Sequence, residues 1–295
     1  MKIEVLICTF RRAFLEQTLA SIAAQVLPDG VGLGVIVADN DISPTAQEMV
    51  RRIAATFPFA LTYIHAPDRN ISIARNACLD TATADYVVFL DDDETAPPDW
   101  IADLWQSVQA TGADAVFAPA LAIYPPETPN WITIPDYHSN RPERRGGQVM
   151  TGHTCNAILR WQGAPWIAVR FDLARGRSGG EDTAFFFSLR RMGAKFEATD
   201  KAEVFEPVVS SRLSFGWLAR RKFRMGQSYA SSEHTRLGQL KLALLALVKA
   251  GFCGLMALLF IGLPTRRNYW ALRSCLHCGV IAGCLALPEP QAYGH

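Results

Sequence analysis

A run of five apolar residues leads directly into four acids in the stretch Tyr86-Val87-Val88-Phe89-Leu90-Asp91-Asp92-Asp93-Glu94. An apolar run of this length, ended by turn-forming residues, predicts a buried strand. Carboxylates crowded this closely raise one another's pKa unless a cation offsets their charge. A divalent ion that prefers hard oxygen ligands, Mg²⁺ or Mn²⁺, suits such a group. The alternative is a solvated turn before the helix that Pro97-Pro98 introduces.

On either side of this stretch, short apolar runs that are typical of strands alternate with segments whose apolar residues have helical spacing. Strands that alternate with helices of about 10–15 residues indicate parallel βαβ units, and continuously apolar strands indicate helices on both faces of the sheet. The sequence therefore predicts an α/β fold with a mostly parallel central sheet. The predicted strands are 3–7, 33–38, 61–65, 86–90, 115–118 and 151–159, and the predicted helices are 13–25, 45–57, 71–83, 100–111 and 181–191.

Polar residues follow several of the predicted strands. Right-handed crossovers place the carboxyl ends of parallel strands at one edge, where ligands of such sheets bind. Residues 9–12 and 91–93 should meet there. Asp39-Asn40-Asp41 can accept hydrogen bonds from a base or a ribose, although a plain Asx turn would also explain this tripeptide.

Two further groups could take part in chemistry. The guanidinium of Arg75 can bind phosphate or neutralise the acids, unless it is simply exposed on a helix. In Gly179-Gly180-Glu181-Asp182, the two glycines precede the predicted helix 181–191 and the two acids begin it. A carboxylate there can take a proton from an attacking hydroxyl, although the helix dipole alone also favours acids at this position.

The composition and the absent motifs exclude several classes of protein. With 49% hydrophobic and 19% charged residues, the chain should be globular. It has no Gly-x-Gly-x-x-Gly after the first strand, no phosphate-binding Gly-x-x-x-x-Gly-Lys-Ser/Thr loop and no Gly-x-Ser-x-Gly elbow. The seven cysteines are irregularly spaced, and Cys275-x-x-Cys278 has no matching pair. We therefore expect reduced thiols in a cytosolic compartment, and small buried side chains rather than a zinc or redox site at this pair.

The C-terminal part differs in composition. Residues 242–263 carry one charge, Lys249, and are long enough to span a membrane. Basic residues flank this segment on both sides, which favours a helix or helical hairpin lying in the cytoplasmic leaflet. A buried helix of a C-terminal subdomain is the alternative. Before it, six prolines in residues 119–147 predict a long loop without a long helix.

Taken together and in this order, the motifs resemble those of the family 2 glycosyltransferases with the GT-A fold. The pieces are Ile7-Cys8-Thr9-Phe10-Arg11-Arg12, Asp39-Asn40-Asp41, Asn76, Asp91-Asp92-Asp93 and Glu181-Asp182, within residues 3–230. The stretches Arg212-Leu213-Ser214 and Arg224-Met225-Gly226-Gln227-Ser228-Tyr229 are similar to bacterial exopolysaccharide transferases of the succinoglycan type.

The resemblance implies a role for each site residue. Asp182 would be the catalytic base of an inverting, single-displacement reaction, and Asp93 and Asp91 would bind the metal, Mg²⁺ or Mn²⁺. The implied nucleotide and substrate contacts are Thr9, Arg11, Asp39, Arg75, Asn76, Asp91, Asp92 and Glu181.

Two departures from the family pattern bear on these roles. Many relatives have a histidine after the base as a further metal ligand, and Glu206 stands at the nearest matching position. The Gln-x-x-Arg-Trp motif of processive relatives is absent, so we expect addition of a single sugar. In its place are the cations of Arg220-Arg221-Lys222-Phe223-Arg224, which could face a lipid diphosphate or anionic lipids.

The expected protein is therefore an inverting glycosyltransferase that uses a UDP-linked or other nucleotide diphosphate sugar. Its acceptor would be a polyprenyl-diphosphate-linked glycan, and it would bind no nucleic acid. We expect a GT-A domain over residues 1–235 and a membrane-associated helical segment over 236–295. Ile3–Ile7 is too short for a signal peptide, which predicts the cytoplasmic face of the bacterial inner membrane. A sugar-1-phosphate nucleotidyltransferase and a non-catalytic nucleotide-sugar-binding module are the alternatives.

Overall fold

The structure is a computed structural model that describes residues 1–177, 179–230 and 235–287. Residues 288–295 of the predicted membrane segment lie outside this range. Contacts between residues divide the chain into two units. Among the described residues, the first unit contains Met1–Leu121 and Ser139–Glu206, and the second contains Ala122–His138 and residues 207–287. The domain boundary predicted at residue 235 remains a prediction.

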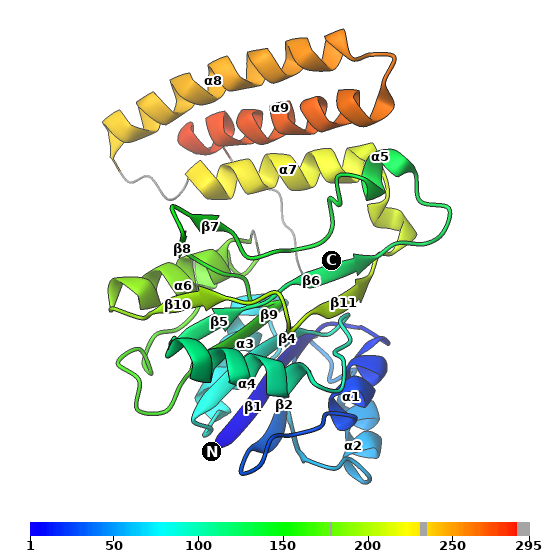
Figure 1. Ribbon diagram of the computed structural model, residues 1–295, viewed down its shortest axis with the longest axis vertical. Helices are drawn as coiled ribbons and strands as arrows, with labels where there is room; N and C mark the ends of the chain where they lie inside the picture. The colour runs from blue at the N-terminus through cyan, green and yellow to red at the C-terminus, as the bar shows by residue number, and fades with distance from the viewer. Residues whose placement is uncertain (178, 231–234, 288–295) are drawn as a thin grey trace. The chain divides into compact units, whose positions relative to one another are not determined.

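The first unit is built on a seven-stranded sheet, which confirms the predicted α/β architecture (Figure 1). The strand order is β10-β5-β9-β4-β1-β2-β3, and every neighbouring pair is parallel except those that involve β9. Its strands are β1 Lys2–Thr9, β2 Gly32–Asp39, β3 Ala60–His65, β4 Tyr86–Asp91, β5 Ala115–Phe117, β9 Asn156–Arg160 and β10 Phe196–Ala198.

Helices cover both faces of this sheet, as the apolar strands predict. On one face, side chains of β1, β2 and β4 pack against α1, α2 and α4. On the other face, the alternate residues of these strands pack against α3 and α6. These helices are α1 Leu15–Ala23, α2 Gln47–Ala54, α3 Ile71–Thr81, α4 Trp100–Thr111 and α6 Glu181–Arg191. The sheet is thus buried on both sides, and its carboxyl edge is left for ligands.

Strand β9 enters the sheet antiparallel, between β4 and β5. At its start the side chain of Asn156 is buried and donates to the carbonyls of Pro119 and Ala202, at 2.9 and 2.6 Å. The backbone N–H of Ala118 donates to the Asn156 carbonyl at 3.0 Å. The chain between β5 and β9 therefore leaves the sheet and returns beside its own starting point.

This excursion is not the plain loop that its prolines predict. It contains the strand β6 Ala120–Ile123, the four-residue helix α5 Asn130–Thr133 and the short hairpin of β7 Arg144–Arg145 and β8 Gln148–Val149. Strand β6 pairs with β11 Val204–Pro207. The prediction that no long helix forms here is confirmed, because α5 is a single turn.

The second unit contains three long helices, α7 Phe215–Ala230, α8 Arg236–Leu259 and α9 Pro264–Cys284. Helix α9 lies between the other two and contacts both (Figure 1). Glycines let α7 and α9 approach closely, since a Cβ at Gly226 would collide with the Leu276 carbonyl and one at Gly279 with the Phe223 carbonyl. Two short 3₁₀ turns, Leu173–Arg175 and Ser210–Arg212, complete the secondary structure of the described residues.

Helix α8 leaves most of its apolar surface exposed. By length and composition it is the one described helix that could cross a membrane, and only 17% of its most apolar window is buried. Leu244, Val248, Leu255 and Leu259 are all more than half exposed. The alternative of a buried subdomain helix therefore does not fit α8, because only one of its faces packs, through Ala246, Ala250 and Cys253.

Candidate active site

The acid motif lies at the carboxyl end of β4, beside the end of β1. The Thr9 hydroxyl donates to Oδ2 of Asp92 at 2.7 Å. Arg12 pairs with both neighbouring acids, at 3.4 Å from Nε to Oδ1 of Asp92 and 3.2 Å from Nη1 to Oδ2 of Asp93. Thr9 is thus at the predicted site, where it orients Asp92. Arg12 had no role in the sequence prediction, although its position after the first strand was a usable signal.

Crowding and burial perturb these carboxylates. Burial raises the pKa of Asp91 to about 7, Arg75 opposes this shift, and Asp93, Asp92 and Glu206 add to it. Burial also raises the pKa of Asp92 to about 6, against the opposing charge of Arg12. A cation beside the motif would remove this penalty, because positive charge stabilises the ionised form. The donor set therefore fits a hard divalent ion.

The carboxylates present would supply only part of a metal's coordination shell. Within residues 1–177, 179–230 and 235–287, no group of three or more His, Cys, Asp or Glu side chains could hold a metal. Mg²⁺ usually takes one or two carboxylates and completes its shell with water and substrate phosphates. The site therefore suits an ion that arrives with a diphosphate.

Glu206 is brought to the acid motif by strand β11. The N–H groups of Thr95 and Phe205 each donate to the other's carbonyl at 2.9 Å. The charge of Glu206 raises the pKa of Asp91, and it also acts on Arg12. Glu206 thus lies close enough to influence the site, as a further metal ligand would require.

Arg75 joins the acid motif to the residues at the start of α6. It is only 7% exposed, pairs with Oε1 of Glu181 and places its other terminal nitrogen 3.9 Å from Oδ1 of Asp91. A simple exposed helix arginine is therefore ruled out. Glu181 is 2% exposed, and within the described chain its Oε2 has no hydrogen-bond partner.

Asp182 follows Glu181 at the start of α6. Its Oδ2 lies 2.9 Å from Nδ1 of His153, and its Oδ1 accepts from the Thr183 N–H at 2.7 Å. Burial raises the pKa of Asp182, but His153, Arg75 and the Thr183 N–H outweigh it and lower the value to about 2. The carboxylate is ionised at neutral pH, as a general base must be. His153 was not predicted, because it lies 29 residues from its partner.

Asp39 is completely buried at the end of β2. Its oxygens accept from the N–H groups of Asp41 and Ala46 and from the Tyr63 hydroxyl, at 2.8–3.1 Å. A nucleobase can reach the Asp39 carboxylate only if the turn that follows β2 moves. The predicted contact between Asp39 and the nucleobase therefore stays a prediction. Arg11 makes a two-pronged pair with Asp41, at 2.7 and 3.0 Å, while half of its side chain stays exposed.

Asn76 holds a neighbouring loop. Its amide donates to the Phe171 carbonyl at 3.0 Å and accepts from the Phe171 N–H at 2.8 Å. The Phe171 ring in turn lies 5.4 Å from the Arg75 guanidinium. Asn76 thus supports the packing around Arg75, and its predicted substrate contact remains a prediction.

The sequence profile described as "Glycosyl transferase family 2" matches residues 4–162 of this chain. The chain belongs to glycosyltransferase family 2. The succinoglycan biosynthesis protein ExoM of Rhizobium meliloti is 44% identical, with 100% of this chain and 96% of that protein covered. The glucosyl-dolichyl phosphate glucuronosyltransferase of Haloferax volcanii is 26% identical, with 77% of this chain and 76% of that protein covered.

Two solved structures share the fold. The mannosyltransferase PcManGT of Pyrobaculum calidifontis, in complex with GDP-mannose and Mn²⁺, has a TM-score of 0.64 at 19% identity, over 95% of this chain and 86% of that one. TarS of S. aureus in complex with UDP-GlcNAc has a TM-score of 0.55 at 14% identity, over 100% and 99% of the two chains. These similarities confirm the predicted GT-A fold.

This family 2 glycosyltransferase is therefore a sugar-transferring enzyme of exopolysaccharide synthesis, as the succinoglycan-type resemblance predicts. Family membership favours it over the nucleotidyltransferase and the non-catalytic module. The roles of individual site residues remain predictions.

Proposed function

We propose that this enzyme transfers one sugar, with inversion, from a UDP-sugar to an isoprenoid-diphosphate-linked glycan at the cytoplasmic face of the inner membrane. The buried contacts of Arg75 support this proposal most strongly. This residue connects Asp91 of the acid motif to Glu181, which directly precedes Asp182. One guanidinium thus links the acid motif, which would bind the sugar donor, to the segment that carries the proposed base of a single-displacement reaction.

In this reaction Asp182 takes the proton from the acceptor hydroxyl. The hydroxyl oxygen forms a bond to the anomeric carbon, and the bond from that carbon to the diphosphate oxygen breaks on the opposite face. The nucleoside diphosphate leaves with the electron pair. His153 would hold the Asp182 carboxylate in a fixed orientation through its hydrogen bond, as a positioned general base requires.

Asp93 and Asp91 would hold a divalent cation, and the charge of Glu206, which already acts on Asp91, would add to its attraction. Bound there, the ion would supply Lewis-acid stabilisation of the leaving diphosphate. Arg12, which pairs with Asp92 and Asp93, is a second positive group at the same end of the site. It would help to neutralise the phosphate oxygens.

The donor and acceptor classes rest on the relatives. TarS was solved with UDP-GlcNAc and PcManGT with GDP-mannose, so both nucleotides belong in a donor screen. The Haloferax relative acts on an isoprenoid phosphate carrying a sugar, according to its name. The likeness to ExoM supports a product that belongs to an exopolysaccharide of the succinoglycan type.

Membrane association rests on the exposed face of α8. A crossing would place Lys249, which lies near the middle of the helix, at the centre of the bilayer. A lysine there costs about 2.5–3.5 kcal/mol. Lys249 lies close enough to His277 of α9 for its charge, after burial, to lower the pKa of that histidine. Lys249 is itself exposed, but it lies one helical turn from the packed residues Ala246 and Cys253, which suits a helix lying in the plane of the leaflet.

A donor-hydrolysis screen tests the proposed activity. The purified protein is incubated with UDP-, GDP- and dTDP-sugars, with and without Mn²⁺. We expect slow, Mn²⁺-dependent release of UDP from one UDP-sugar, and loss of sugar transfer with retained UDP binding in Asp182→Asn. Hydrolysis of GDP-sugars alone would contradict the donor, and normal transfer by Asp182→Asn would contradict the choice of base.

A further inference from the structure

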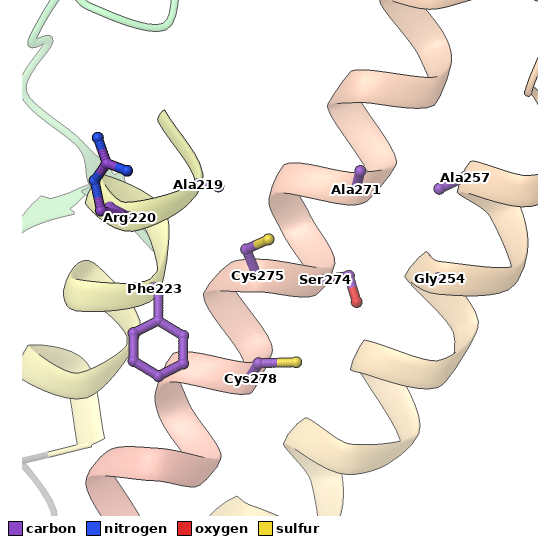
Figure 2. A pocket seen from close by; sticks show the side chains of 9 residues that line it. All are labelled: Ala219, Arg220, Phe223, Gly254, Ala257, Ala271, Ser274, Cys275 and Cys278. Atoms are coloured by element: carbon purple, nitrogen blue, oxygen red, sulfur yellow. The ribbon is translucent and has the colours of Figure 1, made fainter. Parts of the chain in front are cut away.

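A hollow in the second unit runs along α9 between α7 and α8 (Figure 2). Its volume is about 460 Å³. This is within the range of about 300–1,000 Å³ that is typical of small-molecule pockets. The lining contains no carboxylate and one formal charge, that of Arg220. The lining residues are Ala219, Arg220 and Phe223 of α7, Gly254 and Ala257 of α8, and Ala271, Ser274, Cys275 and Cys278 of α9.

The hollow exists because the facing residues of α8 and α9 are small. A Cβ at Gly254 would meet only the Ser274 hydroxyl, at an ordinary 3.9 Å. The same hydroxyl donates to the Ala250 carbonyl of α8 at 3.0 Å, which fixes the spacing of the two helices. Where α7 meets α9, by contrast, a Cβ on Gly226 or Gly279 would collide with backbone. The space is therefore a feature of one helix interface, while the other is closely packed.

A second hollow of about 510 Å³ adjoins the first, because both are lined by Ala257 and Ala271. Leu258 and Ile261 line it as well. Both of these residues are about two-thirds exposed and belong to the apolar surface of α8 and the residues that follow it. The paired hollows are thus continuous with the exposed apolar surface that would face the leaflet.

The charge around the hollows fits an anionic head group. Between Pro207 and Leu287 the sequence has eleven Lys or Arg and one acid, Glu233. Within the described part of the chain, no hydrogen bond or ion pair engages the Arg220 side chain. Arg267 lines the second hollow, and its Nε donates to the neutral Asn268 amide oxygen at 3.1 Å. Guanidinium groups bind phosphate oxygens in a planar, two-pronged geometry.

We propose that the paired hollows bind the prenyl chain of the lipid-linked acceptor, with the diphosphate at Arg220. The proposal rests on the proposed function, since it assigns that acceptor a binding site. The small residues supply the space, the exposed face of α8 supplies the route from the bilayer, and the excess of cations supplies the attraction to the diphosphate.

Photolabelling of the full-length protein in detergent with a diazirine-bearing farnesyl diphosphate tests this site. Gly254→Leu would fill the hollow, and Ala257→Leu would fill it from the next turn of α8. Gly251→Leu is the matched control, because a Cβ at Gly251 has no atom within 4 Å. We expect the label in peptides of α8 and α9 and a loss of labelling of at least tenfold in both hollow variants. We expect a change below twofold in the control, and a several-fold loss in Arg220→Gln.

Competitors identify the occupant. Unlabelled farnesyl diphosphate should abolish labelling, whereas inorganic diphosphate and phosphatidylglycerol should not. Equal labelling of wild type and Gly254→Leu, or competition by phosphatidylglycerol as strong as by farnesyl diphosphate, would overturn the proposal. Donor hydrolysis, measured on the same preparations, should be equal in the wild type, the two hollow variants and the Gly251→Leu control. If the donor is hydrolysed while the hollow stays unlabelled, only this inference fails; if no donor is hydrolysed, the proposed function fails.

Discussion

Nδ1 of His153 lies 2.9 Å from Oδ2 of Asp182, across two segments of chain that are far apart in sequence. His153 and then Arg75 are the partners that hold the pKa of this carboxyl at about 2 against burial. Removing His153 should therefore raise the pKa of Asp182. The base would then begin to lose activity by protonation at a higher pH.

His153→Ala should lower kcat and shift the acid limb of the pH–rate profile upward. One hydrogen bond to a charged group contributes about 1.5–3 kcal/mol, which corresponds to a loss of roughly 10- to 100-fold. The side chain in His153→Gln can still donate a hydrogen bond. Its kcat and its acid limb should therefore lie between those of His153→Ala and those of the wild type. An acid limb at the wild-type position in His153→Ala would show that His153 does not act through Asp182.

Arg75→Gln should destabilise the first unit by about 3–5 kcal/mol, because it leaves the buried Glu181 carboxylate without its cation. Thermal or denaturant unfolding measures this change. The double variant Arg75→Gln/Glu181→Gln should recover part of the loss, since neither group is then charged. The matched control is Arg177→Gln, whose pair with Asp68 is exposed and should contribute at most about 1 kcal/mol. Equal effects of the two single variants would contradict the bridging role.

Asp93→Asn should weaken Mn²⁺-dependent UDP binding by roughly 100-fold, as removal of a direct metal ligand would. Isothermal titration with and without Mn²⁺ measures the effect. Asp99→Asn removes the same charge six positions later, from an exposed side chain that caps no helix N–H. It should bind UDP as wild type does, so matching losses in both variants would indicate a general charge effect instead.

The affinity for UDP and Mn²⁺ should rise as pH increases from about 5.5 to 8. The pKa of Asp92 is about 6 and that of Asp91 about 7, so each carboxyl must release its proton before it can offer both oxygens to a cation. Titration in buffers with different heats of ionisation should show proton release on binding near pH 6.5. Binding that is independent of pH over this range would place the ion away from Asp91.

Val248→Glu should reduce membrane binding by about tenfold or more. The residue is 72% exposed on the apolar face of α8, and charged residues are costly in the apolar region of a bilayer. Flotation with phosphatidylglycerol-containing vesicles measures the bound fraction. Val26→Glu alters an equally apolar and exposed side chain in the first unit and should leave flotation unchanged. Wild-type flotation of Val248→Glu would refute the proposed orientation of α8.

Local patterns were sufficient to predict the parallel core. The strands β1 to β4 and the helices between them lie where the apolar periods place them, because each βαβ unit is set by neighbouring sequence. The antiparallel insertion of β9 was beyond such patterns, since a strand's direction depends on the chain that precedes it. The interface of α7 and α9 depends on glycines 53 positions apart, Gly226 and Gly279, and no local period reveals that pairing.

The site was predictable to the extent that it lies at strand ends. Thr9 and Asp92 meet because β1 and β4 are neighbours, as the parallel sheet requires. The Arg75–Glu181 ion pair and the His153–Asp182 hydrogen bond required the path of the chain after β5. At Asp39 the position at a strand end was a weaker guide to function. Its place in the sequence fits a ligand contact, but its oxygens already accept hydrogen bonds from the surrounding turn and from Tyr63.

The hydrogen bond between Ala118 and Asn156 has an evolutionary consequence. It joins the two ends of the excursion at 3.0 Å, so the positions of β5 and β9 in the sheet do not depend on the length of the chain between them. The entropy of closing such a loop grows only slowly with its length. A longer or shorter excursion would therefore cost little additional free energy. Descendants of this enzyme could differ in this segment while the sheet stays unchanged.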